Sequence, residues 1–293
     1  GSGVNLGSAP LTITGGAVSV LSSSALGSGT VTLNGGTLEL AATGTYSKAI
    51  IIGASGATLS ATASGETIYS TALAADNALT LSSSTNSILR LSGALSGAST
   101  LTKSGSGNSN LQSVGGFTGA LNVSDGLLVI ESAMGTSGSH SSAISIGGIL
   151  SLTSSSNQTF SGAITGSGSL AKSGGGTLTL TGANTGFTGS TSVTNSTLSL
   201  SHSQGAGSST ITLDNATLSR NAPSTTVANN LVIGAGGATI AGRQPIDDYT
   251  TFSGSITGSA NVRTDGLVLL AGSAAGFSGQ YIIADSTSYL RFT

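Results

Sequence analysis

The feature that most constrains the fold of this chain is a short repeated unit of two alternating segments joined by a turn of small residues. In residues 30–40, TVTLNGGTLEL, apolar residues alternate with threonine and glutamate on both sides of Asn34-Gly35-Gly36. This alternation puts the apolar side chains on one face of a strand and the polar ones on the other. Related units occupy 26–40, 136–152 and 205–220. The pattern predicts many short strands joined by tight turns.

A longer repeat contains an aromatic anchor followed by Thr or Ser and then Gly. The anchors are Phe117, Phe187 and Phe277, and their unequal spacing shows that material is inserted between copies. A unit this small cannot bury a core alone, so its repetition predicts a stacked array. The three copies span residues 91–130, 160–200 and 252–292.

The composition selects a solenoid from the all-β architectures. No segment of the chain has a helical apolar period, and glycine-rich turns such as Gly174-Gly175-Gly176 accept positive φ at little steric cost. A sandwich or barrel needs large residues in a common core, whereas the chain has no Trp and only 4% aromatics. Leu, Ile, Val and Ala are sufficient to fill a narrow stack of coils. The 37% apolar content argues against a disordered Gly/Ser linker.

The same architecture explains the low charge. Only 6% of the residues are charged, against roughly 25% in ordinary soluble domains. Stacked coils place equivalent residues above one another, so we expect Ser, Thr and Asn to form hydrogen-bonded ladders on the outside that serve as the polar surface.

In residues 166–193 the pattern Leu-x-Lys-x-Gly-x-Gly-Thr-Leu-x-Leu-x-Gly-x-Asn is followed by an aromatic residue, Thr and Gly. This segment resembles the passenger-associated transport repeat, also called the autotransporter-associated β-strand repeat. Looser copies stand at 99–130 and 260–292, where Arg263 lies near the lysine position of the repeat. The resemblance implies a right-handed parallel β-helix in a large exported bacterial surface protein, and it implies no activity. The matching residues are Leu170, Lys172, Gly174, Gly176, Thr177, Leu178, Leu180, Gly182, Asn184, Phe187, Thr188 and Gly189.

We therefore expect residues 1–293 to form a single elongated β-solenoid. The function favoured by the sequence is that of a rigid structural rod in a cell-surface filament, sheath or adhesin stalk. A glycan-binding adhesin module is the alternative, and a β-helix polysaccharide hydrolase or lyase is a third reading. Glycan binding would be favoured by aromatic platforms on the long loops expected at 62–78 and 241–251, which hold only Tyr69 and Tyr249.

Few residues are candidates for chemistry. Asp247 and Asp248 are the only adjacent acids, and paired aspartates serve polysaccharide hydrolysis. The companions that such enzymes need are missing around them, and His140 and His202 stand in ordinary repeat segments. We interpret the two aspartates as part of a solvated loop. The chain is predicted not to be an enzyme and to have no catalytic, cofactor-binding or metal-ligating residue.

Lys103 and Lys172 recur at one position of the repeat. One interpretation is that they form a basic stripe that binds anionic polysaccharide. The interpretation we favour places both lysines on the outer face of a coil, where charge discourages lateral pairing of strands.

Partners and location follow from charge and patterning. The net charge is −2 and the basic residues are scattered, so the sequence has no basic cluster that could bind nucleic acid. The absence of cysteine excludes disulfides. No apolar run is long enough for a membrane span. Residues 1–10 lack the basic segment followed by an apolar segment that is typical of a secretion signal. We expect an extracellular or cell-surface protein. Because residues 1–20 and 281–293 read as ordinary strands and not as polar caps, we also expect end-to-end self-association.

Overall fold

The computed structural model describes residues 6–221, 226–242 and 249–293. It is all-β, with parallel sheets stacked as a β-solenoid of about 14 turns and no helix among the described residues. The prediction of an all-β parallel β-helix is therefore confirmed. Two compact units divide the chain, unit 1 at Gly1–Ser151 and unit 2 at Leu152–Thr293. Within the part that the structure describes, no helix is long and apolar enough to cross a membrane.

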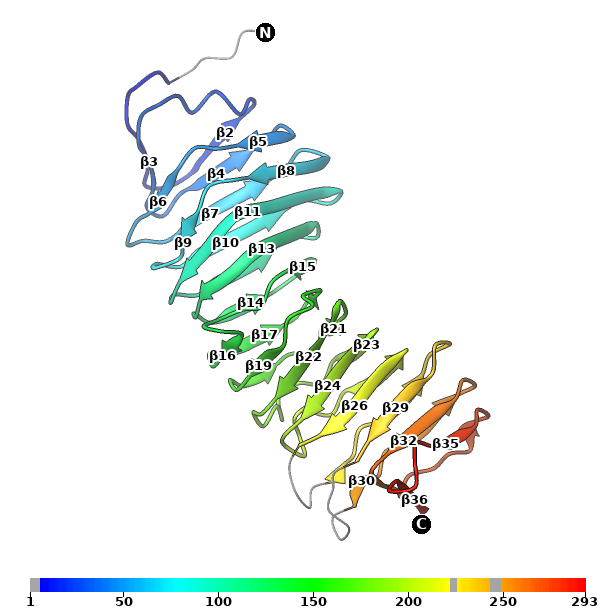
Figure 1. Ribbon diagram of the computed structural model, residues 1–293. Coiled ribbons are helices and arrows are strands. Elements are labelled where there is room, and N and C mark those ends of the chain that lie inside the picture. The colour runs from blue at the N-terminus through cyan, green and yellow to red at the C-terminus, as the bar shows by residue number, and fades with distance from the viewer. Residues whose placement is uncertain (1–5, 222–225, 243–248) are drawn as a thin grey trace. The chain divides into compact units, whose positions relative to one another are not determined.

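Unit 1 is built of three stacks of short parallel strands, which run from blue to green in Figure 1. The first stack is β1 (Leu11–Ile13), β3 (Val31–Leu33) and β6 (Ile50–Ile52). The second is β2 (Ala17–Val20), β4 (Thr37–Leu40), β7 (Ala57–Ala61), β10 (Leu79–Ser83), β12 (Leu101–Ser104), β14 (Leu121–Val123) and β17 (Ile144–Ile146). The third is β5 (Gly44–Tyr46), β8 (Gly65–Tyr69), β11 (Ser87–Gly97), β13 (Asn108–Phe117) and β15 (Leu127–Ile130), with β9 (Leu73–Ala74) paired to β11. The strands β16 (Ser139–His140) and β18 (Ile149–Leu152) follow.

The strands of unit 2 also lie in three stacks of short parallel strands. The first is β21 (Ser169–Lys172), β23 (Ser190–Thr194), β25 (Thr210–Asp214), β28 (Leu231–Ile233), β31 (Ile256–Gly258) and β34 (Gly276–Phe277). The second is β19 (Gln158–Phe160), β22 (Gly175–Leu180), β24 (Ser196–Leu200), β26 (Ala216–Arg220), β29 (Ala238–Ala241), β32 (Val262–Asp265) and β35 (Tyr281–Ile283). The third is β27 (Thr226–Val227), β30 (Thr250–Phe252), β33 (Leu267–Leu270) and β36 (Tyr289–Phe292). The two-residue strand β20 (Ile164–Thr165) precedes β21.

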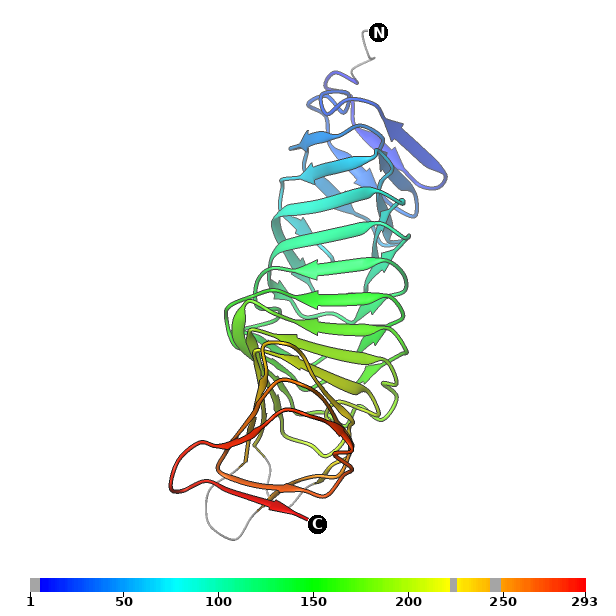
Figure 2. The same cartoon turned by 90° about the vertical axis from the view of Figure 1, so that its right-hand side faces the viewer.

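The interior of each coil is filled by aliphatic side chains that lie above one another. Leu178, Leu198 and Leu218 are partners on β22, β24 and β26, and all three are fully buried. Leu180 has the same parity as Leu178 and is also buried, so the alternation expected at this strand is confirmed. Figure 2 shows the ladder that results in unit 1, where successive strands lie one below the next. Burial of this apolar surface is the main source of stability.

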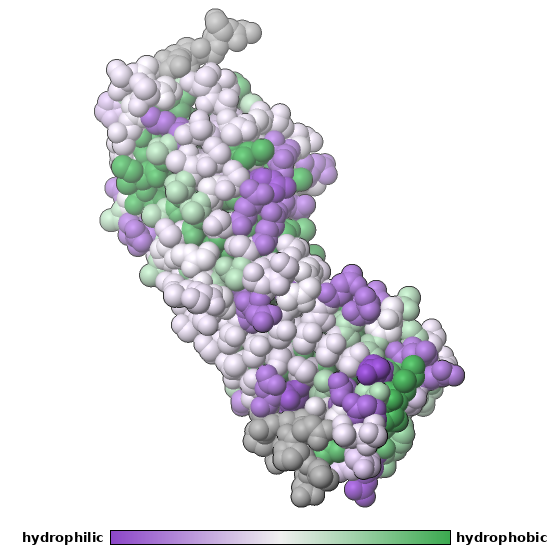
Figure 3. Space-filling view, in the orientation of Figure 1, coloured by the Kyte–Doolittle hydropathy of each residue, from purple (hydrophilic) through white to green (hydrophobic). Residues whose placement is uncertain are grey.

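The outer faces carry columns of hydroxyl groups, as the low charge predicts. Thr58, Thr80 and Thr102 are register partners on β7, β10 and β12, and each is half-buried. Elsewhere the ladders form hydrogen bonds between coils, such as the 2.9 Å contact between the Ser169 and Ser190 hydroxyls. On the face of Figure 3 most of the surface is therefore neither strongly hydrophilic nor strongly hydrophobic.

The prediction of a long loop at residues 62–78 is wrong. Residues 62–78 contain β8 and β9, and Tyr69 is buried in the interior with its hydroxyl donating to the Lys48 carbonyl at 2.9 Å. A tyrosine with a satisfied hydroxyl fills the coil here as an aliphatic residue does elsewhere. Of the other loop, 241–251, residues 243–248 lie outside the described residues, and Tyr249 is half-buried.

Candidate functional site

The structure contradicts the outer-face position of the repeat lysines. Lys103 has an exposed fraction of 0% and Lys172 of 2%, so both point into the coil. The reason lies in the strand parity, because Lys103 follows Leu101 by two residues and Lys172 follows Leu170 by two. Both leucines are buried, and the lysines share their side of the strand. Lys103 is the penultimate residue of β12 and Lys172 is the last residue of β21, so each ammonium group reaches the turn that follows.

The ammonium groups are held by backbone carbonyls of neighbouring coils. Lys103 Nζ donates to the carbonyls of Ser104 at 2.7 Å, Gly105 at 2.6 Å and Asp125 at 3.3 Å. Lys172 Nζ donates to the carbonyls of Ser173 and, at 2.7 Å, of Ser154. In both cases one carbonyl belongs to the lysine's own turn and another to the adjacent coil. These contacts tie successive turns together, because a buried donor must be satisfied.

The turn glycines allow this close approach. Gly126 has φ +66°, and a Cβ at this position would meet the Gly105 carbonyl and the Lys103 ammonium. Gly174 has φ +85°, and a Cβ there would collide with the Thr153 carbonyl. Glycine is therefore required at both positions for conformation and for space. Burial lowers the pKa of Lys103 to about 8, while the Asp125 carboxylate opposes that shift, and burial lowers the pKa of Lys172 too.

The burial of these amines gives a direct chemical prediction. The chain has three lysines, and the third, Lys48, is half-exposed. Brief treatment of the folded protein with an acetylating reagent should modify Lys48 and the N-terminal amine, while Lys103 and Lys172 react at least about tenfold more slowly because they need local opening. Peptide mass spectrometry gives the rates. In denaturant all three lysines should react alike, and a Lys103 that reacts as fast as Lys48 in the folded protein would contradict the buried position.

A second cluster joins charged residues on the outside of unit 1. Arg90 donates through Nε to Glu66 Oε1 at 2.6 Å and through Nη1 to Glu131 Oε1 at 3.1 Å. Gln112 Nε2 donates to the other oxygen of Glu131 at 3.3 Å. The hydrogen bond that Arg90 donates to Glu66 is the main cause of the raised pKa of Arg90. Since these side chains are partly exposed, each pair contributes about 1 kcal/mol or less, and the cluster serves to align coils.

The histidines and aspartates that were considered for catalysis are not brought together among the described residues. His140 is buried and stacks on Phe117 with ring centroids 6.1 Å apart, and burial lowers its pKa. His202 lies in a turn of unit 2, where its Nδ1 accepts from the Gln204 backbone N–H at 3.1 Å. Asp247 and Asp248 lie outside the described residues. Across residues 6–221, 226–242 and 249–293, no group of three or more His, Cys, Asp or Glu is placed to hold a metal ion.

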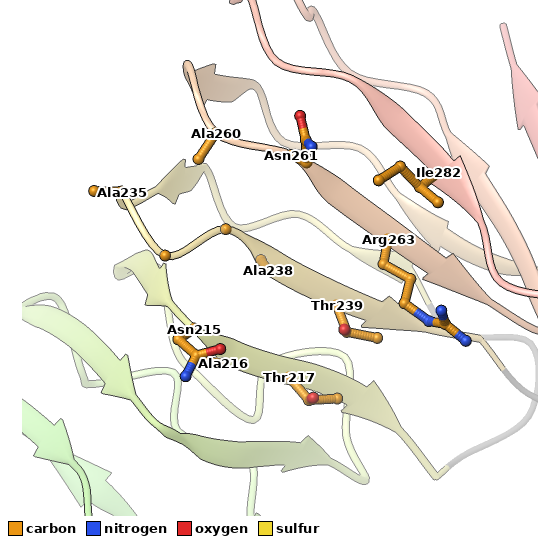
Figure 4. Close-up of a pocket in the computed structure, with 12 residues that line it drawn as sticks. Asn215, Ala216, Thr217, Ala235, Ala238, Thr239, Ala260, Asn261, Arg263 and Ile282 are labelled. Carbon is orange, nitrogen blue, oxygen red and sulfur yellow. The ribbon is translucent and has the colours of Figure 1, made fainter.

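A hollow in unit 2 is the best candidate for ligand binding, and the sequence did not predict it. It has a volume of about 520 Å³ and lies along the turns that lead into β26, β29 and β32. Figure 4 shows its lining side chains on successive strands and on the turns that lead into them. Small residues form the floor, which leaves the space above them open. The residues that line the hollow are Asn215, Ala216, Thr217, Ala235, Gly236, Gly237, Ala238, Thr239, Ala260, Asn261, Arg263 and Ile282.

Strand register arranges the polar residues of the hollow in a row. Thr217 pairs with Thr239, Thr239 with Arg263, and Arg263 with Ile282. These are outward positions of four consecutive strands, which parallel pairing spaces by about 4.8 Å. The row therefore offers two hydroxyls and one guanidinium, with an apolar side chain at its end.

Two asparagines border the row on its turn side, and the hydrogen bonds they already make fix their amide orientation. Asn215 donates through Nδ2 to Asn195 Oδ1 at 2.7 Å, and Asn261 Oδ1 accepts from the Gln280 backbone N–H at 3.1 Å. Asn215 thus keeps an acceptor oxygen and Asn261 a donor amide group for a ligand. An acceptor, donors and hydroxyls together are suited to a polyhydroxylated molecule.

Comparison of the chain with models of protein families, with curated proteins and with solved structures found no match.

Proposed function

We propose that this protein is a structural component of a bacterial cell surface, a rigid solenoid rod that forms part of a filament, sheath or adhesin stalk. The observation that carries the proposal is the coil-on-coil register. Thr177, Thr197 and Thr217 are partners on the outside of β22, β24 and β26, while leucines are partners on the inside. A stack in which both faces repeat is a means of spanning distance stiffly. The resemblance of residues 166–193 to the passenger repeat supports an exported protein of the autotransporter type.

A second candidate function is glycan binding by the same surface structure. The hollow in unit 2 favours it, because hydroxyl, amide and guanidinium groups line one open surface. The two functions are compatible, since a stalk can carry binding sites along its length. The sequence-based expectation that the chain has no catalytic activity stays a prediction.

Assembly end to end is the part of the proposal that an experiment tests most directly. The last described strands of unit 2 are β35 and β36, which pair with β32 and β33. Tyr289 and Phe292 on β36 are 55% and 56% exposed, and Ile282 and Ile283 on β35 are exposed as well. These exposed apolar side chains can bind another copy of the chain, and a head-to-tail contact between copies continues without closing.

We expect the purified chain to form filaments in electron microscopy and to show a rising mass in light scattering with concentration. The double variant Tyr289→Lys with Phe292→Lys should remain folded and lose the filaments, because two charges replace exposed apolar side chains of the contact. A matched control, Ile149→Lys with Val232→Lys, adds the same charge at exposed apolar positions of β18 and β28 and should still assemble. If the unmodified chain stays monomeric at high concentration, the assembly proposal fails.

A further inference from the structure

The row of Arg263, Thr239 and Thr217 places a positive charge toward one end of the hollow of unit 2 and neutral hydroxyl groups toward the other. Arg263 is exposed, and within the described ranges it forms no ion pair. In Figure 4 its side chain extends along the outer side of the strands, near Thr239. The Asp214 carboxylate borders the turn of the hollow, where its Oδ1 accepts from the Gly236 backbone N–H at 2.6 Å. Arg263 is the one cation among the described residues that line the hollow.

We propose that this hollow binds a short stretch of an acidic polysaccharide, with Arg263 holding a sugar carboxylate. The inference rests on the second function proposed above, glycan binding, and adds the class of sugar. Thr217, Thr239 and the amides of Asn215 and Asn261 bind the ring hydroxyls. The volume of the hollow, about 520 Å³, suits an oligosaccharide of a few units.

The chemistry of each group supports a carboxylate at one end. A guanidinium presents planar paired donors that match the two oxygens of a carboxylate, and such charge-assisted contacts are stronger than neutral ones. Asp265 follows Arg263 by two residues on the same exposed face of β32. Its charge repels a carboxylate placed beyond Arg263, so the acidic group is confined to the hollow side.

The geometry supports a chain-like ligand. The row crosses four strands, so its polar groups recur along the direction in which the coils stack. The interval of about 4.8 Å between strands is comparable with the advance per sugar unit of an extended polysaccharide. The floor of Gly236, Gly237 and Ala238 carries no large side chain to interrupt such a ligand.

Titration calorimetry with defined oligosaccharides tests the inference. The probes are tetramers of galacturonate and of mannuronate, and the control ligand is the galacturonate tetramer with its carboxylates methyl-esterified. We expect at least one acid tetramer to bind at least about tenfold more tightly than the ester, because the ester keeps the hydroxyls and loses the charge. Raising the salt concentration should weaken this preference, since the site is exposed.

Variants locate the binding on the protein. Arg263→Gln should remove the preference for the acid, whereas Arg291→Gln, which neutralises an exposed arginine outside the hollow, should change nothing. Ala235→Trp places a large side chain at an exposed position of the lining and should block acid and ester alike. Unchanged melting temperatures confirm that each variant folds.

The remaining outcomes overturn the proposal in distinguishable ways. If acid and ester bind equally and Ala235→Trp blocks both, glycan binding stands and the acidic inference fails. If neither acid tetramer binds, or if Ala235→Trp has no effect, the hollow is not the site and both fail. Equal losses in Arg263→Gln and Arg291→Gln would show a diffuse charge effect and would also overturn the inference.

Discussion

Leu180→Asp is expected to lower the free energy of unfolding by more than about 4 kcal/mol, which is a large share of the usual total of about 5–15 kcal/mol. Leu180 is buried in unit 2 between its register partners Phe160 and Leu200. The change removes a packed aliphatic side chain and places a carboxylate without a partner in an apolar interior. Thermal melting followed by circular dichroism measures the loss, and hydrogen exchange shows which coils open.

The matched control is Thr179→Asp, one residue away on the half-buried outer side of β22. Here the carboxylate reaches water, so we expect a change of less than about 1 kcal/mol. The contrast between adjacent positions is the test of the inward and outward assignment. Equal losses of unfolding free energy at both positions, or tolerance of both substitutions, would contradict the assignment of Leu180 to the inside and Thr179 to the outside of β22.

The stability of the fold should rise between about pH 8 and pH 10. Lys103 has a pKa of about 8 in the folded protein and an ordinary value of 10.5 when unfolded. Between these values the unfolded chain binds more protons, so the free energy of unfolding increases with pH. The integrated effect of this one group is at most about 3 kcal/mol. Below pH 8 the full cost of the buried charge is present, and Lys172 adds a change of the same sign.

Above pH 10 the trend should reverse. Burial raises the pKa of Tyr69 to about 12 and raises that of Tyr46 as well. In this range the unfolded tyrosines have lost protons that the folded ones keep, so stability falls with pH. Denaturant unfolding measured from pH 7 to pH 11 should therefore show a maximum near pH 10.

Methionine variants identify the groups responsible. Lys103→Met with Lys172→Met keeps unbranched side chains in the interior and removes the titrating amines. The loss of hydrogen bonds to turn carbonyls will lower stability at every pH, but the rise from pH 8 to pH 10 should disappear. Lys48→Met, at the half-exposed lysine, should leave the rise intact. A double variant that still gains stability over this range would contradict the assignment.

The parts of the fold that could be predicted were those fixed locally. Alternation of apolar and polar residues set the strands, and glycines such as Gly174 set the turns, because both depend on neighbours in the chain. Val31 and Leu38 are buried as their alternation requires. The scarcity of aromatic residues excluded a wide core and left the narrow coil that is observed.

The two buried lysines were predicted wrongly because the general rule that charged residues are exposed was preferred to the alternation pattern of their strands. Parity with Leu101 and Leu170 placed Lys103 and Lys172 inside, but the usual cost of burying a charge favoured the outside. The cost is offset here by carbonyls that converge from two adjacent turns. That convergence depends on how coils stack, and the sequence of one coil does not contain it.

The surface sites were missed for a related reason. Glu66 and Glu131 lie 24 and 41 residues from Arg90 along the chain, and they meet it only after the coils are stacked. The hollow likewise joins Thr217, Thr239 and Arg263, whose unequal spacing follows from turns of different length. Sequence repeats of variable period do not reveal such a register.

The ladder of buried side chains tolerates turns of different length, and this bears on how the sequence can vary. Leu178, Leu198 and Leu218 are partners at intervals of 20 residues, whereas Leu121 and Ile144 are partners 23 residues apart, and both ladders remain parallel and in register. An odd interval would reverse every side chain if strands alone absorbed it, so the turns must absorb the difference. Residues can therefore be gained or lost at a corner of the solenoid, and the loop there can change its sequence, while the ladder of buried side chains beneath it keeps its register.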